Sequence, residues 1–432
     1  MNTSTKKGKG LGEYMPLAFA AGIGSMLGSG IIVGLSATIV VWQEGLGLDT
    51  TQVGLLSGIL TFAIAFGSLF GGRLADKIGR VLFFNWINLF YAIGAAICVF
   101  APNFTVLLIG LIIAGLASGA DLPVSMTIVS HDAPDEATAA QLVSTTQVFW
   151  QVGVFISFIC AFLVSAMQGA TGGRVVFAIL AVFAVIAWLW RLLSPTFRRF
   201  HEAADVRDAA RPAVVGNGKV SVTKVLFGAD KKVLLTYFLA IVIFYVGWNL
   251  LANTWGQFQT YMFSKAGAAQ SLATGLGIIL NFVTLVLNIV FASIAGGKYR
   301  NKAFFAGIVI SLIAMAAMAM GGADLWVIVG ATAFMNLGSP LAGEALYKVW
   351  TQESFPIEIR ASIQGFINGF SRLCCGLFAL ITPALVLPET IQTTMWCFFG
   401  IVIIEGIAGT IMIRAQKKYG TDEERQACKI AA

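Results

Sequence analysis

GRLADKIGR, residues 72–80, separates two apolar runs at residues 52–71 and 82–100. The glycines of this stretch permit a tight reversal of the chain, and its charged side chains are costly to place in hydrocarbon. A bilayer core about 30 Å thick needs roughly 20 apolar residues per helix, so each flanking run is long enough to cross a membrane. The stretch therefore predicts a short loop between two membrane-spanning helices.

The composition extends this interpretation to the whole chain. Of its 432 residues, 58% are hydrophobic and 11% are charged, whereas soluble domains are about 45–50% apolar and about 25% charged. A soluble globule of this size cannot bury so much apolar surface, and the mean hydropathy of +0.84 agrees. An ordinary soluble enzyme, a secreted disulfide scaffold and a disordered chain are therefore excluded.

Twelve apolar runs are long enough to span a bilayer, and charged, glycine or proline residues separate them. The runs cover residues 16–41, 52–71, 82–100, 105–129, 143–166, 174–193, 234–262, 271–294, 303–320, 325–348, 362–386 and 393–414. They lack the strict alternation of a barrel strand. The sequence therefore predicts an all-α integral membrane protein with twelve transmembrane helices.

One long polar segment, residues 194–232, divides these runs into two sets of six. We interpret it as a cytoplasmic linker between an N-terminal bundle, residues 1–193, and a C-terminal bundle with a cytoplasmic tail, residues 233–432. Pro134 and Pro356 fall at matching points after the fourth and tenth runs. The match predicts an internal duplication and two pseudo-symmetric bundles.

Lysine and arginine gather in alternate loops. They lie before the first run and within residues 72–80, 198–232 and 298–302, whereas the opposite loops keep only Arg174 and Lys265. The positive-inside rule then places both termini in the cytoplasm, and we expect the plasma (cell inner) membrane. The net charge of +7 reflects this bias and contact with anionic lipid, so no nucleic-acid partner is predicted.

No cofactor or metal site is predicted. The six cysteines lack metal-ligand or CxxC spacing, and the chain has two histidines. Neither a nucleophile–base set nor a phosphate-binding loop is present, so we do not expect an enzyme. A non-transporting receptor is disfavoured because the linker of residues 194–232 is too short to form a sizeable signalling domain.

Residues 72–80 resemble the G-x3-D-[RK]-x-G-R motif of the major facilitator superfamily. The resemblance implies the major facilitator fold and alternating access, with a gate at the cytoplasmic ends of the two bundles. The gate residues implied are Gly72, Asp76, Gly79, Arg80, Glu353 and Arg360. Physically, the carboxylate of Asp76 is suited to the positive N-terminal end of a helix.

Further motifs are similar to the sugar-porter branch. Glu353-x2-Pro356-x3-Arg360 resembles the E-x2-P-x3-R that follows helix 10 in those transporters, and Gln147 resembles their sugar-contacting glutamine. Asn253 falls on their helix 7 asparagine. The resemblance implies a secondary active transporter of a small polar solute, most simply a sugar or sugar derivative.

The departures from that branch concern substrate and coupling. Gly247 and Trp248 stand where sugar porters usually have two glutamines, and the first run lacks the acid that proton-coupled members pair with an arginine. Leu111 stands near the position of that arginine. Proton symport therefore requires other residues, and a facilitative uniporter is an open alternative.

Four ionisable residues lie deep in predicted runs, namely Asp121, Glu344, Arg372 and Glu405. Each costs about 2.5–3.5 kcal/mol on insertion scales, so each requires a compensating role. One interpretation is that Arg372 binds a polar or anionic solute, with Asp121 or Glu344 as counter-ion and proton carrier. The other is that they have structural roles such as ion pairs, and for Glu405 we favour a structural or inter-helix role.

Amides and tryptophans in the runs supply a candidate pocket for hydroxylated solutes. In the seventh run Asn249, Asn253 and Gln257 share one helix face. The predicted substrate-binding residues are Gln147, Gln151, Trp248, Asn249, Asn253, Trp255, Asn281, Asn336, Gln364, Asn368 and Arg372. Amides also join helices to one another, and tryptophans also form interfacial belts, so structural roles are the alternative.

The sequence thus predicts a transporter that moves a sugar-like solute by alternating access, with proton symport expected. The alternatives are a transporter of a small organic anion, such as a carboxylate or sugar acid that binds Arg372, and a uniporter. The expected partners are the small polar solute, protons and membrane lipids. We expect a monomer.

Overall fold

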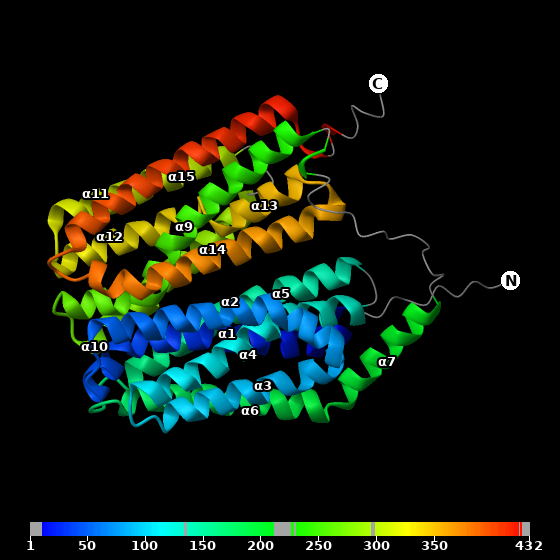
Figure 1. Cartoon of the computed structure of the whole chain (residues 1–432), viewed down its shortest axis with the longest axis horizontal. Helices are drawn as coiled ribbons and strands as arrows, with labels where there is room; N and C mark the ends of the chain where they lie inside the picture. The colour runs from blue at the N-terminus through cyan, green and yellow to red at the C-terminus, as the bar shows by residue number, and fades with distance from the viewer. Residues whose placement is uncertain are drawn as a thin grey trace. The chain divides into compact units, whose positions relative to one another are not determined.

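The computed structural model describes residues 11–133, 136–210, 226–228, 230–294, 299–422 and 424–425. In this part of the chain every regular element is a helix (Figure 1). The helices are α1 (Leu11–Leu46), α2 (Thr50–Ile78), α3 (Arg80–Val99), α4 (Phe104–Asp132), α5 (Glu136–Leu163), α6 (Thr171–Leu193), α7 (Pro195–Ala210), α9 (Lys231–Lys265), α10 (Gln270–Ile294), α11 (Arg300–Gly321), α12 (Leu325–Gly338), α13 (Glu344–Ser354), α14 (Ile357–Leu385) and α15 (Ile391–Tyr419).

The helices match the predicted runs. Among the described residues, ten helices are long and apolar enough to cross a membrane. Two shorter apolar helices, Val148–Leu163 and Leu325–Gly338, fall in the fifth and tenth predicted runs. The prediction of an all-α membrane protein is confirmed.

The tenth predicted run, residues 325–348, is broken where the sequence predicted one helix. α12 ends at Gly338 and α13 begins at Glu344, with a turn between them. Pro340 has no backbone N–H to donate to the helix, and Ser339 before it, which caps the end of α12, still has helical dihedral angles. Gly343 then has φ −144° and ψ −144°, outside the helical region.

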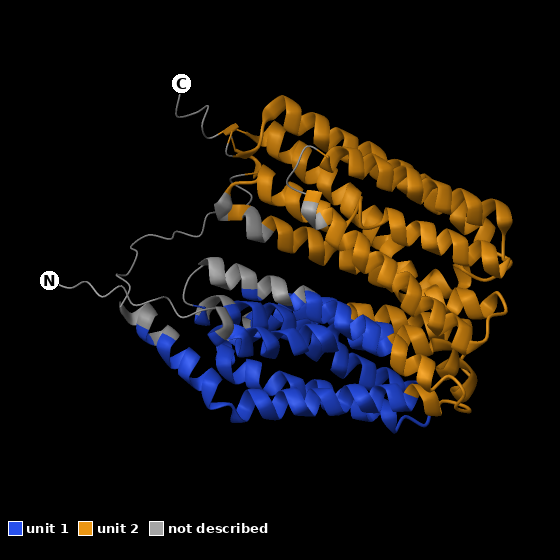
Figure 2. Cartoon of the chain, turned by 180° about the vertical axis from the view of Figure 1, so that it is seen from behind, with its two compact units in different colours: residues 1–34, 63–157, 174–214 blue, residues 35–62, 158–173, 215–432 orange. Residues whose placement is uncertain are grey.

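The described chain forms two compact units (Figure 2). Unit 1 contains residues 1–34, 63–157 and 174–214, and unit 2 contains residues 35–62, 158–173 and 215–432. Unit 2 therefore combines the second half of the sequence with the α1–α2 turn and the α5–α6 connection. The proposed bundle boundary at residues 194–232 stays a prediction.

A buried ion pair joins four helices of unit 1. The Arg191 guanidinium of α6 donates to both carboxylate oxygens of Asp121 on α4, at 2.7 and 3.1 Å. It also donates to the carbonyl oxygens of Phe84 on α3 and Ala20 on α1, at 3.0 and 2.8 Å. A Cβ on Gly24 of α1 would lie 1.8 Å from an Asp121 oxygen, so only glycine leaves room for the pair.

The polar segment after the sixth run begins with a helix, α7, which the sequence interpretation treated as linker. The ring of Phe200 on α7 stacks on Tyr14 of α1, with centroids 5.1 Å apart. His201 on the same helix contacts the buried carboxylate of Asp132 at the end of α4. Aromatic and polar contacts therefore hold α7 against α1 and α4 within unit 1.

The ion pair generates a stability prediction. We expect Arg191→Met to destabilise the protein by about 3–5 kcal/mol, because it leaves the Asp121 carboxylate buried without its partner. The free energy of unfolding is measured by tryptophan fluorescence in a denaturing detergent titration. Asp121→Leu together with Arg191→Met should recover most of the loss, since no lone charge is left.

The control is Arg198→Ala, which removes an exposed ion pair with Glu202 on α7. Exposed pairs contribute little to stability, so this variant should unfold like the wild type. A loss in Arg191→Met no larger than that of Arg198→Ala would contradict the assigned role of the buried pair.

Candidate functional site

The break between α12 and α13 presents free backbone groups near the middle of α9. The Trp248 indole N–H donates to the carbonyl oxygen of Ser339 at 3.2 Å and to its hydroxyl at 2.9 Å. A Cβ on Gly343 would lie 2.6 Å from the indole nitrogen, so glycine permits this approach. Discontinuous helices of this kind form the substrate sites of many transporters.

Three aromatic rings line the same region. Tyr245 of α9 stacks on Tyr347 of α13 with ring centroids 3.8 Å apart, and on Trp248 with centroids 5.7 Å apart. The rings are held by their neighbours, whereas Trp248 itself is only half-buried. A half-buried indole suits contact with the C–H face of a sugar ring.

A chain of polar contacts joins α9 to α14. The Asn249 side-chain amide donates to the Ser371 hydroxyl at 2.9 Å, and that hydroxyl donates to the Asn368 carbonyl oxygen at 2.9 Å. The Arg372 side chain donates to the side-chain oxygen of Asn368 at 3.0 Å. Three of the predicted site residues are thus brought together, and each is half-buried.

Charged side chains lie beside this series of polar contacts. Glu344, the first residue of α13, forms an ion pair with Lys348 at 2.8 Å. Their side chains are 44% and 35% exposed respectively, so the pair faces open space. Arg372 acts on the Glu344 carboxylate electrostatically. With one acid and two bases, this cluster carries a surplus positive charge.

Asn253 belongs to a second polar group on α9. Its side-chain oxygen accepts a hydrogen bond from Gln257 at 2.7 Å, and Gln257 also donates to the Thr61 hydroxyl of α2 at 2.9 Å. Asn253 shares a helix face with Asn249, as the spacing predicted. Gln257 therefore links the polar face of α9 to α2.

Other predicted substrate residues lie apart from this cluster. Trp255 is buried and donates to the Thr332 hydroxyl of α12 at 3.2 Å. Asn281 donates to the Gly277 carbonyl of its own helix at 2.9 Å. Their substrate role stays a prediction.

Four more predicted substrate residues have weaker or undescribed relations to the cluster. Gln364 accepts a hydrogen bond from Gln352 at 3.0 Å, and Asn336 is half-buried on α12. Gln151 is half-buried on α5, in the part of that helix that belongs to unit 1. The side chain of Gln147 lies outside the described residues.

The predicted gate residues of the α2–α3 loop are described in part. Gly79 separates the two helices with φ +110°, a conformation that favours glycine. Nothing lies within 4 Å of a Cβ added to Gly72. Arg80 is the first residue of α3 and is exposed. The Asp76 side chain lies outside the described residues.

Glu353, the predicted gate residue after the tenth run, is bound within unit 2. Arg300 at the start of α11 donates to its two oxygens at 2.6 and 3.0 Å. Gln416 of α15 adds a hydrogen bond at 3.3 Å. The Arg360 side chain lies outside the described residues, and the gate role of both residues stays a prediction.

Glu405 is buried on α15 against α9. A Cβ on Gly247 would lie 2.7 Å from its Cγ, so the glycine that replaces the usual glutamine makes room for this carboxyl group. One carboxyl oxygen has no hydrogen-bond partner among the described residues. The structural or inter-helix role that we favour for Glu405 stays a prediction.

Three features were missed from the sequence: the helix break and Tyr245 in the site, and the buried partner of Asp121 in unit 1. The break at Ser339 was signalled by Pro340 and Gly343 inside a predicted run. The Asp121 partner, Arg191, lies two residues before the end of the sixth predicted run, and the sequence pattern assigns it no role. Tyr245 carried no distinguishing signal, since aromatic residues are common in apolar runs.

Apolar helices arranged around a polar, broken-helix site define a multi-pass membrane transport protein rather than an enzyme. The sequence pattern of the Major Facilitator Superfamily matches residues 17–379. The chain belongs to this superfamily.

The relatives agree with the sugar-porter-like resemblance. The chain is 30% identical over 407 residues to the minor myo-inositol transporter of Bacillus subtilis (strain 168), covering 91% of this chain and 89% of that protein. It is 28% identical over 179 residues to a probable polyol transporter of Arabidopsis thaliana, covering 41% of this chain and 33% of that protein. The niacin transporter of Acinetobacter baylyi is 32% identical over 154 residues, covering 35% and 34%.

Solved structures confirm the major facilitator fold. A D-xylose–proton symporter superposes with a TM-score of 0.73 at 14% identity, covering 91% of this chain and 96% of that chain. The inward-open xylose transporter from E. coli gives 0.70 at 15% identity, covering 96% and 99%.

Proposed function

We propose that this protein transports a small neutral polyhydroxylated solute, a sugar or cyclic polyol such as myo-inositol, by alternating access and proton symport. The observation that carries the proposal is the cluster of Trp248, Asn249, Asn368 and Arg372 beside the broken helix. We place the protein in the cell inner membrane with both termini on the cytoplasmic side, following the positive-inside rule.

The chemistry of the cluster suits hydroxyl groups. Side-chain amides both donate and accept hydrogen bonds, as each hydroxyl of a polyol does. The half-buried Trp248 offers an apolar face between them. The similarity to the myo-inositol transporter of Bacillus subtilis, over nine-tenths of the chain, supports the same class of solute.

Close helix contacts at the α1–α2 end of unit 2 support alternating access. A Cβ on Gly54 of α2 would lie 2.1 Å from the Leu380 carbonyl oxygen of α14, and one on Gly58 would lie 2.4 Å from the Leu380 side chain. In the proposed orientation this end faces the outside. We propose that these helices separate there to admit the solute.

An organic anion is the second candidate. Arg372 and Lys348 outnumber Glu344 in the cluster, and a surplus positive charge in a low-dielectric site favours an anion. The shorter match to the niacin transporter of Acinetobacter baylyi supports this candidate. A uniporter is the alternative to symport.

The two solute classes differ in how they depend on two side chains. In proteoliposomes, Asn249→Ala should weaken myo-inositol uptake affinity by about tenfold, since a lost hydrogen bond costs about 1–1.5 kcal/mol. Arg372→Ala should change myo-inositol affinity less, because a neutral solute gains less from a cation. Asn301→Ala, at the start of α11, is the matched control.

Labelled nicotinate is tested in the same vesicles. Saturable nicotinate uptake that Arg372→Ala abolishes, without myo-inositol uptake, would overturn the polyol proposal in favour of the anion. If Arg372→Ala changed the affinity of no transported solute, its role in the pocket would be rejected.

Proton coupling is assigned to Glu344 rather than Asp121. The Glu344 side chain is 44% exposed, whereas that of Asp121 is 2% exposed and bound to Arg191. The groups that face Glu344 are Lys348, Arg372, Tyr245 and Tyr347. A proton on Glu344 would release Lys348 from its ion pair.

For Glu344→Gln, we expect concentrative uptake driven by an imposed pH gradient to fall to the level seen without a gradient. Exchange of labelled for unlabelled solute should persist, since exchange needs no net proton movement. Glu202→Gln, exposed on α7, should keep gradient-driven uptake. Wild-type uptake that ignores the pH gradient would exclude symport and leave the uniporter.

The glycine contact predicts a shift between conformations. Gly54→Ala places a methyl group against the Leu380 carbonyl, so the helices cannot close. A cysteine is introduced at Ser57 in a background whose six native cysteines have been replaced. In Gly54→Ala this cysteine should react roughly tenfold faster with an external maleimide than in the same background with Gly54, as the closed population falls. Gly400→Ala is the control, since no atom lies within 4 Å of its added Cβ. Equal rates in both variants would reject the closure.

A further inference from the structure

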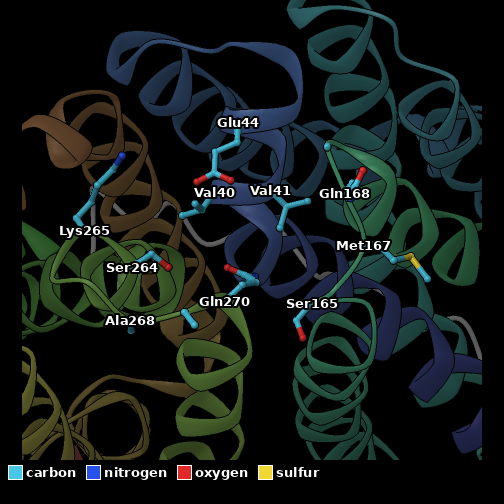
Figure 3. Close-up of a pocket in the computed structure, with 12 residues that line it drawn as sticks. Val40, Val41, Glu44, Ser165, Met167, Gln168, Ser264, Lys265, Ala268 and Gln270 are labelled. Atoms are coloured by element: carbon cyan, nitrogen blue, oxygen red, sulfur yellow. The ribbon is translucent and has the colours of Figure 1, made fainter.

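A second polar pocket, with a volume of about 410 Å³, lies at the α1–α2 end of unit 2 (Figure 3). The volume is within the range of about 300–1,000 Å³ that is typical of small-molecule sites. The pocket is formed by the last turns of α1, the α5–α6 connection and the α9–α10 turn. It does not include the cluster around Trp248.

The walls combine opposite charges with amides. Glu44 and Lys265 both line the pocket, as do Gln168 and Gln270, and Val40 forms part of an apolar surface between them. Among the described residues neither Glu44 nor Lys265 forms an ion pair. The Lys265 ammonium lies over the Tyr261 ring, 5.1 Å from its centroid, and within the described part of the chain neither charge is neutralised by an oppositely charged side chain.

Two further polar atoms in the walls lack partners. The side-chain oxygen of Gln270 and the hydroxyl of Ser264 are buried without a hydrogen-bond partner among the described residues. Buried polar groups are usually satisfied, by protein or by water. These two atoms have almost no accessible surface, so a molecule in the pocket meets the wall through exposed polar side chains such as Glu44 and Gln168.

The donor and acceptor set selects a class of ligand. One carboxylate and one ammonium leave the pocket without net charge, so a neutral molecule enters with no uncompensated charge. Adjacent hydroxyls can donate to the Glu44 carboxylate and the Gln168 side-chain oxygen and accept from Lys265. This chemistry fits the same neutral polyol as the transport site, and this step rests on the proposed function.

The pocket is complete only while α1, the α5–α6 connection and the α9–α10 turn are in contact. The Gln270 amide donates to the Ala37 carbonyl oxygen of α1 at 2.5 Å, which joins α10 to α1 beside the pocket. Under the proposed alternating access, α1 and α10 belong to different bundles that separate at this end. A molecule that binds this pocket therefore binds the closed arrangement and stabilises it.

We infer that this pocket is a second, inhibitory site for the transported polyol, which holds the external end closed when the external solute concentration is high. Linkage requires that its occupancy lowers the fraction of protein able to accept solute from outside. The open, charged walls indicate weaker binding than at the transport site, so inhibition appears only above the concentration that saturates transport.

The test is initial uptake of labelled myo-inositol into proteoliposomes over a wide range of external concentrations. Wild-type uptake should rise to a maximum and then fall roughly twofold or more, as closed protein accumulates. Glu44→Gln and Lys265→Gln should each abolish the fall. Glu389→Gln, an exposed carboxylate on the α14–α15 connection, should retain it.

Equilibrium binding of the same label counts the sites. Two sites per chain are expected for the wild type, and one for Glu44→Gln, whose remaining site also shows that the variant is folded. Transport with simple saturation and a single wild-type site would overturn the inhibitory site while leaving the proposed function intact. Inhibition by glycine betaine but not by myo-inositol would overturn the assigned ligand class.

Discussion

Every charge and every free backbone group within the hydrocarbon must find a partner inside the protein. The Arg191 guanidinium meets this constraint with Asp121 and two backbone carbonyls in unit 1. In unit 2 the break after α12 frees the Ser339 carbonyl, which accepts the Trp248 indole N–H. The same constraint therefore both stabilises one unit and forms the polar site of the other.

The two arrangements differ in how much freedom they leave. The ion pair of unit 1 is almost completely buried and has hydrogen bonds on several sides, so it has little capacity to bind anything else. The Glu344–Lys348 pair has a third or more of each side chain exposed. A pair that exchanges its partner with a solute or a proton needs that exposure, which is why we assign coupling to Glu344.

The sequence predicted the helical type and the approximate positions of the apolar helices, because apolar length is a local property. It also placed Asn249 and Asn253 on one face of a helix, since helical spacing is local too. It could not show that Asn249 meets Ser371 or that Trp255 turns away to Thr332, because these contacts depend on how helices pack. Arg191 was missed for a related reason, since a charge near a helix end has the same local pattern whether it faces lipid headgroups or a buried carboxylate.

The replacement of glutamine by Gly247 shows how packing changes the meaning of a motif. By local pattern, glycine at this position is only the loss of a sugar-binding amide. In the structure the space is taken by Glu405 from α15, approaching α9 from a different side than the Asn249 contact with α14. The polar group lost at position 247 is therefore not restored in the pocket, and we propose that Trp248, Asn249 and Asn253 carry solute recognition on α9 instead.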